Sequence, residues 1–354
     1  MSKNHISNEK IEFNKHQSEI KKQSQFKCCF WGEQHKDCSD DIISAHSIQR
    51  GKILDSIAEE GMVSYLTADP SNDLSEISPT FELEGIRKFS TFYGFCGKHD
   101  KEVFQPIEDK SFEGTEEQLN LYAYRAISKE LYAQEISLRK NKLLLGDVIN
   151  ENCPPHYLLT YPSILSGNIV VPEYIKEDIK QKVQEESIRQ RIKNIEQNIK
   201  GLSLLEGYLK NVIKNQESSL IKHQTYIFDY DIPIACSGVF FLYIGPSGES
   251  ILNQSETVME AITVDNCKNT ILNVFPENGK TYVIFSTIKT NDKVINFVNN
   301  LLSDNDNINW KLSHVILNHI ENIAFRPSYI DTFSDKETRS TLFQVSFSNA
   351  LCSI

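Results

Sequence analysis

The stretch Phe95-Cys96-Gly97-Lys98-His99-Asp100 decides how the N-terminal third of this chain folds. It separates a cysteine and a histidine by one turn of a helix, so that a helix starting here presents both side chains on the same side. Thiolate and imidazole are donors that zinc prefers in structural sites, where it takes four ligands in a tetrahedron. The sequence therefore predicts that Cys96 and His99 form one half of a zinc site.

The other half of the site must come from cysteines upstream. Cys28 and Cys29 are adjacent, and Cys38 follows across a polar loop that contains Gly32. We predict that Cys28 or Cys29 pairs with Cys38, across a gap wider than the usual spacing of about two to four residues. His35 lies inside this gap and is an alternative ligand to Cys38. In the remaining interpretation, these cysteines are unligated thiols of the core.

The order of these residues resembles the zinc-bound form of the HNH endonucleases. The chain reads Cys … Cys … Ala45-His46-Ser47-Ile48 … Cys96-x-x-His99-Asp100. The resemblance covers residues 28–105 and implies a ββα-metal or treble-clef core in which His99 is the fourth zinc ligand. It also implies that His46 is the general base and that Asp100 binds a catalytic Mg²⁺ or Mn²⁺. The implied activity is cleavage of DNA or RNA by a bacterial antiviral or mobile-element protein.

The chemistry implied by this resemblance is coherent. A neutral imidazole takes a proton from water near neutral pH. A hard cation held by a carboxylate stabilises the charge of the phosphoryl transition state and of the leaving oxygen. We therefore expect His46 and Asp100 to lie in one exposed cleft, apart from the zinc, if the chain is a nuclease.

Residues 26–125 are also similar to a group of uncharacterised bacterial zinc-binding proteins. The matching pieces include Ala45-His46-Ser47-Ile48-Gln49, Phe104-Gln105-Pro106-Ile107-Glu108 and Tyr124-Arg125-Ala126. Glu108 is interpreted as a second carboxylate near Asp100 or as a surface residue that caps a turn. Arg125 is interpreted as a phosphate-binding residue or as the partner of a nearby glutamate.

The fold class that we predict is α+β, with several domains. A polar, lysine-rich lead-in is followed by the zinc-binding unit, a helical region and a C-terminal α/β or α+β domain. We place these four regions at residues 1–25, 26–112, 113–225 and 226–354.

The helical region contains a heptad-like seam. Thr115 followed by Gln118 resembles a capping box at the start of a first helix. In a second helix, apolar residues alternate steps of four and three, which is typical of a coiled coil or a long helical hairpin. We weigh packing within the monomer against self-association or a protein partner. The seam residues are Ile188, Ile192, Ile195, Ile199, Leu202 and Leu209.

The C-terminal region is rich in aromatic and β-branched residues, which favours strands. Strands followed by helices indicate an α/β or α+β domain. We predict strands at Tyr226–Phe228, Ile232–Ala235, Val239–Ile244 and Thr281–Phe285, and helices near 291–303 and 311–322.

The bulk properties favour an ordinary globular chain. It has 354 residues and a net charge of -11, whereas dedicated nucleic-acid binders usually carry a basic surplus. This charge favours an alternative function, a non-catalytic zinc-stapled module that binds a protein. We find no signal peptide and no apolar run long enough to cross a membrane, so we expect a cytoplasmic protein. Its eight cysteines are then expected to be thiols or metal ligands.

Overall fold

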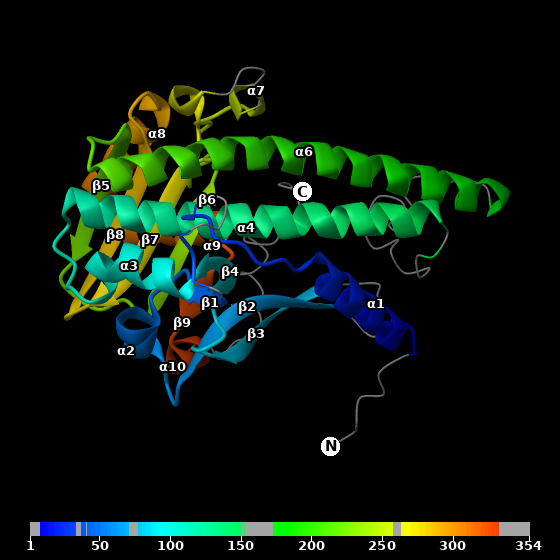
Figure 1. Ribbon diagram of the computed structural model, residues 1–354, viewed down its shortest axis with the longest axis horizontal. Helices are drawn as coiled ribbons and strands as arrows, with labels where there is room; N and C mark the ends of the chain where they lie inside the picture. The colour runs from blue at the N-terminus through cyan, green and yellow to red at the C-terminus, as the bar shows by residue number, and fades with distance from the viewer. Residues whose placement is uncertain are drawn as a thin grey trace. The chain divides into compact units, whose positions relative to one another are not determined.

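The computed structural model describes residues 8–32, 37–39, 41–70, 77–150, 152, 173–257 and 263–332. Helices and strands are mixed in it, as the expected α+β class requires (Figure 1). The chain forms two compact units, each built from separate segments. The first comprises Met1–Phe26, Thr67–Thr80 and Ala133–Ile199, and the second comprises Lys27–Leu66, Phe81–Tyr132 and Lys200–Ile354. The division into four consecutive regions stays a prediction.

The predicted zinc-binding segment contains a two-stranded antiparallel sheet, whose second strand is followed by a helix. Strand β1 (Ile42–His46) pairs with β4 (Thr91–Cys96), with Ile42 opposite Cys96 and His46 opposite Thr91. Helix α3 (Gly97–Glu108) begins directly after β4. After β1 the chain is helical at Arg50–Leu54 (η1) and Asp55–Ile57 (α2). The chain then turns through Glu60 and Gly61, both at positive φ.

A seven-stranded sheet contains the strands β5 to β9 of the second unit, together with β2 and β3, which have residues in both units. Its strand order is β3-β2-β9-β6-β7-β8-β5. Strands β7 and β8 are joined by Asn278 and Gly279, whose φ values of 54° and 76° suit the tight turn of a hairpin. The strands are β2 (Met62–Pro70), β3 (Ile77–Gly85), β5 (Ile221–Phe228), β6 (Ile234–Phe240), β7 (Thr270–Glu277), β8 (Lys280–Ile288) and β9 (Ile323–Phe325).

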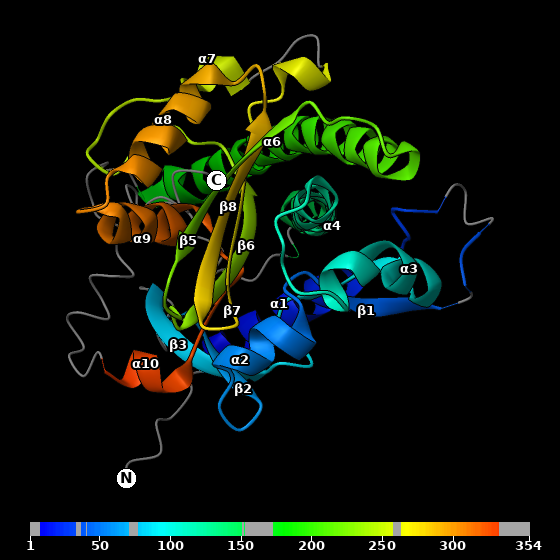
Figure 2. The same ribbon diagram turned by 90° about the vertical axis from the view of Figure 1, so that its left-hand side faces the viewer.

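Helices cover both faces of this sheet (Figure 2). On one face, α8 (Asp292–Ser303) and α9 (Ile308–His319) pack on a core that includes Leu272, Val283 and Phe285. On the other face, Tyr122 of α4 stacks on Phe275 of β7 with ring centroids 4.8 Å apart. Burial on both faces explains why β7 is buried almost throughout.

The strands predicted in the C-terminal region are partly corrected by the structure. The two strands expected at Ile232–Ala235 and Val239–Ile244 are replaced by the single strand β6, which ends at Phe240. Gly238 lies within this strand because a Cβ there would come within 3.2 Å of the Ile320 side chain. Strand β7 was not predicted, whereas the two expected helices are confirmed as α8 and α9.

Two long helices, α4 (Glu116–Ile149) and α6 (Glu173–Asn215), pass through both units. The N–H of Gln118 donates to Thr115 Oγ1 at 3.3 Å, as the capping prediction requires. The Gln118 side chain instead accepts from Glu113 and Gly114 and donates to Pro106 and Ser111. In α6, the seam residues Ile188, Leu202 and Leu209 are buried within the chain itself. This burial supports packing within the monomer; a coiled coil between chains stays a prediction.

The remaining elements are short or lie outside the sheet. Helix α1 (Asn8–Ser24) lies within the lysine-rich segment that we expected to be a flexible lead-in, and its His16 Nε2 lies 3.0 Å from Asp147 Oδ2. No helix in the described part of the chain is both long and apolar enough to span a bilayer. The other elements are α7 (Gln254–Thr257), η3 (Val264–Asn266) and α10 (Pro327–Asp331).

Candidate metal centre and neighbouring polar residues

Four predicted ligands converge in one place in the second unit. The His99 Nδ1 atom lies 3.3 Å from the Cys29 Sγ, 3.7 Å from the Cys38 Sγ and 3.4 Å from the Cys96 Sγ. All four donor atoms lie within 4.8 Å of one another. Among the described residues, no other group of three or more His, Cys, Asp or Glu side chains gathers in this way. His35, the alternative ligand, lies outside those residues.

The local fold explains why Cys29 rather than Cys28 is in this cluster. Residues 28–30 run beside β4, because the N–H of Cys28 donates to Tyr93 at 3.1 Å and that of Phe30 donates to Gly94 at 2.9 Å. Successive side chains of an extended segment point to opposite sides. The Cys28 thiol lies near the Tyr93 carbonyl, at 3.9 Å, and Cys29 therefore faces the cluster. Of the two cysteines that the sequence offered, the cluster contains Cys29.

Cys96 and His99 occupy the first turn of α3. Cys96 is the N-cap residue, and its Sγ accepts a hydrogen bond from the His99 N–H at 3.5 Å. Gly32 completes the site, because a Cβ at that position would overlap the Cys38 Sγ. The loop glycine is therefore required by the close approach of the two segments.

The spacing of the donors fits a tetrahedral ion. With zinc-to-sulfur bonds of about 2.3 Å and zinc-to-nitrogen bonds of about 2.0 Å, a tetrahedron separates a sulfur from a nitrogen donor by about 3.5 Å. The three sulfur-to-nitrogen distances of 3.3, 3.4 and 3.7 Å scatter around that value. A Cys₃His donor set can therefore hold a metal ion such as zinc.

The electrostatics of the cluster also suit a cation. Burial, together with the neighbouring Cys29 and Cys96, raises the pKa of Cys38 to about 12. Burial acts to raise the pKa of Cys96 as well, but hydrogen bonds from the His99 N–H and from Ser39 hold it at about 7. Burial and the Lys98 charge lower the pKa of His99. A bound dication would stabilise the crowded thiolates that otherwise repel one another.

His46, the predicted general base, is the last residue of β1. Its Nε2 lies 2.9 Å from the carbonyl oxygen of Ile86, so Nε2 donates and Nδ1 carries the lone pair. Burial is the largest influence on the pKa of His46 and lowers it, and the charges of Arg50 and Arg125 act in the same direction. The imidazole is half-buried and neutral at neutral pH.

Asp100, the predicted ligand of a catalytic metal, lies in the first turn of α3. Its Oδ1 is buried and has no hydrogen-bond partner among the described residues. Burial raises the pKa of Asp100, while the charge of Arg125 opposes that rise. His46 and Asp100 therefore both lie within electrostatic range of Arg125, and also of Glu108.

Arg125 and Glu108 form a close ion pair between α4 and α3. The Nη2 of Arg125 lies 2.6 Å from the Glu108 Oε1, and Arg125 is only 2% exposed. This contact agrees with the interpretation of Arg125 as the partner of a glutamate. Gln49, which the sequence motif includes without a role, donates from Nε2 to the Glu108 carbonyl at 2.9 Å. Gln49, Glu108 and Arg125 are far apart in the sequence, and folding brings them into contact.

A Ser-His-Asn arrangement also appears, although the sequence gives no local signal for it. The Nδ1 of His223 lies 2.8 Å from the Ser286 Oγ, and its Nε2 lies 3.1 Å from the Asn120 Oδ1. Ser286 is 1% exposed, so its hydroxyl is inaccessible to a substrate. This network joins α4 to the sheet and is structural.

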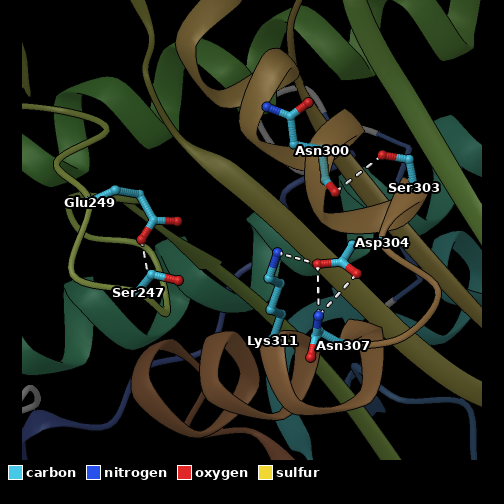
Figure 3. Close-up of polar contacts among 7 residues, drawn as sticks. All are labelled: Ser247, Glu249, Asn300, Ser303, Asp304, Asn307 and Lys311. Atoms are coloured by element: carbon cyan, nitrogen blue, oxygen red, sulfur yellow. Dashed lines mark hydrogen bonds and ion pairs between the residues drawn. The ribbon is translucent and has the colours of Figure 1, made fainter.

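A cavity of about 480 Å³ lies between the loop after β6 and helices α8 and α9. Its charged groups already have partners (Figure 3). Lys311 Nζ lies 2.7 Å from Asp304 Oδ2, and Glu249 accepts from the Ser247 N–H at 2.8 Å. Lys293 is bonded to Glu256 at 2.9 Å. The two lysines of the cavity are therefore in ion pairs, and the Glu249 carboxylate is held by a backbone N–H.

Comparison with protein-family models, curated proteins and solved structures gives no match to this chain.

Proposed function

We propose that Cys29, Cys38, Cys96 and His99 bind one structural Zn²⁺ and that the chain is an HNH-like, metal-dependent nuclease. One observation carries this proposal. A two-stranded antiparallel sheet, whose second strand leads directly into a helix, has His46 at the end of its first strand and Asp100 in the first helical turn, beside a Cys₃His cluster. This is the order of elements that the HNH resemblance implies. Bacterial antiviral defence is the setting that we propose for the activity.

His46 acts as the general base in this proposal. Its lowered pKa leaves the imidazole neutral, and its Nδ1 accepts a proton from a water molecule. The water oxygen then attacks phosphorus, and the bond from phosphorus to the leaving sugar oxygen breaks. The Ile86 carbonyl fixes the ring orientation through Nε2.

Asp100 supplies carboxylate oxygens, the donors that Mg²⁺ and Mn²⁺ prefer. The Oδ1 of Asp100 is a free acceptor among the described residues, although it is buried and does not lie in the exposed cleft that we expected of a nuclease. When bound, the cation would supply stabilisation of the charge on the phosphoryl oxygens and the leaving group. The zinc would fix the helix that carries Asp100.

A second candidate function is a non-catalytic, zinc-stapled module that binds a protein through the helical region. Two observations favour it. The Cys₃His cluster is the single group of three or more such ligands among the described residues, and His46 is half-buried and bonded to a backbone carbonyl. The net charge of -11 also disfavours binding to phosphates.

Metal analysis and a cleavage assay separate these functions. We expect one zinc per chain, and cleavage of DNA or RNA in Mg²⁺ or Mn²⁺ that falls at least about 100-fold in His46→Ala and in Asp100→Asn. His314→Ala, a change on α9, is the matched control. A zinc-loaded wild type that cleaves no nucleic acid contradicts the nuclease and leaves the module. Pure protein without zinc contradicts both.

A further inference from the structure

We infer that Gln49, Glu108 and Arg125 form a brace that sets the position of His46 relative to Asp100, with Arg125 as its positioning residue. The inference rests on the proposed nuclease function for its chemical consequence. It is drawn from contacts that link the strand end carrying His46, the helix carrying Asp100 and helix α4.

Gln49 is the first link of the brace. It lies three residues after His46, is 7% exposed and donates to the backbone carbonyl of Glu108. Glu108 is the last residue of α3, where carbonyl groups lack partners within the helix. The contact therefore satisfies a helix end and at the same time ties it to the chain that leaves β1.

Arg125 is the second link, and it lies against one face of α3. Asp100, Phe104 and Glu108 are spaced by four residues, so they share that face. The Arg125 guanidinium lies 3.9 Å from the centre of the Phe104 ring and 2.6 Å from the Glu108 carboxylate. Its charge also acts on Asp100 at the other end of the same stripe.

The burial of Arg125 explains why it positions other groups and does not bind substrate. It is 2% exposed, and its Nε has no hydrogen-bond partner among the described residues. A buried guanidinium destabilises the folded state unless it is paired with an opposite charge. The pairing with Arg125 therefore holds the Glu108 carboxylate in one place. Lysine keeps the charge but not the planar fork that contacts a carboxylate and an aromatic face together. Arg125→Lys is therefore expected to disturb the geometry while it preserves the charge.

The test compares Arg125→Lys and Glu108→Gln with Arg189→Lys, a matched change at an exposed ion pair on α6. For each variant, zinc content, kcat, KM and the pKa of His46 from NMR titration are measured. We expect Arg125→Lys to keep its zinc and its KM while kcat falls about 100-fold, as a displacement of about 1 Å can cause. Glu108→Gln should also lower the pKa of His46, because it removes a nearby negative charge.

The outcomes separate this inference from the nuclease proposal. If the wild type cleaves and zinc-loaded Arg125→Lys has a wild-type kcat, the brace is wrong and the nuclease stands. If the wild type does not cleave, the nuclease is wrong and the NMR titration decides the brace. An unchanged His46 pKa and unchanged ring signals in both variants then contradict it. Should Arg125→Lys fail to fold, the same criteria apply to Glu108→Gln, which retains an acceptor for Arg125.

Discussion

The β1–β4 strand pair with α3 and the strands β5 to β9 of the seven-stranded sheet belong to the same compact unit but have different sources of stability. The sheet buries a continuous apolar core that includes Leu272, Val283 and Phe285 beneath α8 and α9. The β1–β4 strand pair has only two strands, and an isolated pair of strands is marginal in water. Its extra support comes from buried aromatic residues such as Phe95 and Phe104, from four side chains that could hold a metal ion and from polar links to α4. This region thus adds polar and metal-ligand side chains to its apolar burial, whereas the seven-stranded sheet relies mainly on apolar burial.

The largest expected effect is loss of the metal centre through Cys29→Ser. Structural zinc sites contribute about 10 kcal/mol or more to folding in small zinc domains, so under the zinc proposal we expect the β1–β4 strand pair and α3 to lose their order. Hydrogen exchange should become fast in residues 91–108 while β7 and β8 stay protected. Cys28→Ser is the matched control, because that thiol points to the Tyr93 carbonyl. Equal protection of α3 in both variants would contradict the contrast between the two regions.

The next effect concerns the sheet. Leu272→Ala removes a fully buried side chain and should lower the free energy of unfolding by about 2–5 kcal/mol. Leu83→Ala deletes the same atoms from a side chain that is 59% exposed, and it should cost less than about 0.5 kcal/mol. Urea unfolding followed by circular dichroism measures both. Zinc content should be unchanged in the folded Leu272→Ala protein, and a loss of zinc there would show that the two regions are not separately stabilised.

The sequence predicted the two cluster residues that lie close together in the chain, Cys96 and His99, better than the two that come from a distant segment. Cys96 and His99 are set by one helical turn, which is a local property. The choice of Cys29 over Cys28 depends on how residues 28–30 pair with β4, and no local pattern fixes that pairing. The Arg125–Glu108 pair likewise needed the packing of α4 on α3 to be known.

Among the elements that build and cover the sheet, the helices α8 and α9 were predicted from the sequence, whereas strand β7 was not. Strand β7 contains Asn273 and Pro276, residues that local propensity disfavours in strands. Its burial between helices on both faces overrides that preference. Strand β6 was predicted as two separate strands, whereas the structure continues it through Gly238, where an added Cβ would lie 3.2 Å from the Ile320 side chain.

A smaller loss of stability is expected at acidic pH, and it arises at His223 in strand β5 of the sheet. Burial, with the charges of Lys289 and Lys222, lowers the pKa of His223 to about 4. Since the unfolded imidazole binds a proton near pH 6.5, the stability that His223 contributes is complete above that pH and is lost as the pH falls toward 4. The loss should be about 2 kcal/mol at pH 5.

Urea unfolding of the wild type and of His223→Gln at pH 7.5 and pH 5 measures the part of the unfolding free energy that His223 contributes. The difference between the two proteins cancels the acid sensitivity of the thiolates, which is common to both. We expect the wild type to lose more stability than His223→Gln over this interval. Parallel pH profiles would show that His223 does not titrate in the unfolding transition and that the sheet side lacks this sensitivity.

The smallest effect is expected at the start of α4, which contacts both regions. Thr115→Ala removes the acceptor for the Gln118 N–H and should cost about 1 kcal/mol, whereas Thr115→Ser keeps the hydroxyl and should cost little. Tyr122 of α4 stacks on Phe275 in the sheet, and Tyr124 stacks on Phe104 in α3. Fraying of the first turn should therefore weaken hydrogen-exchange protection in β7 and in α3 by similar amounts. A loss confined to one of them would mean that α4 is anchored to that region alone.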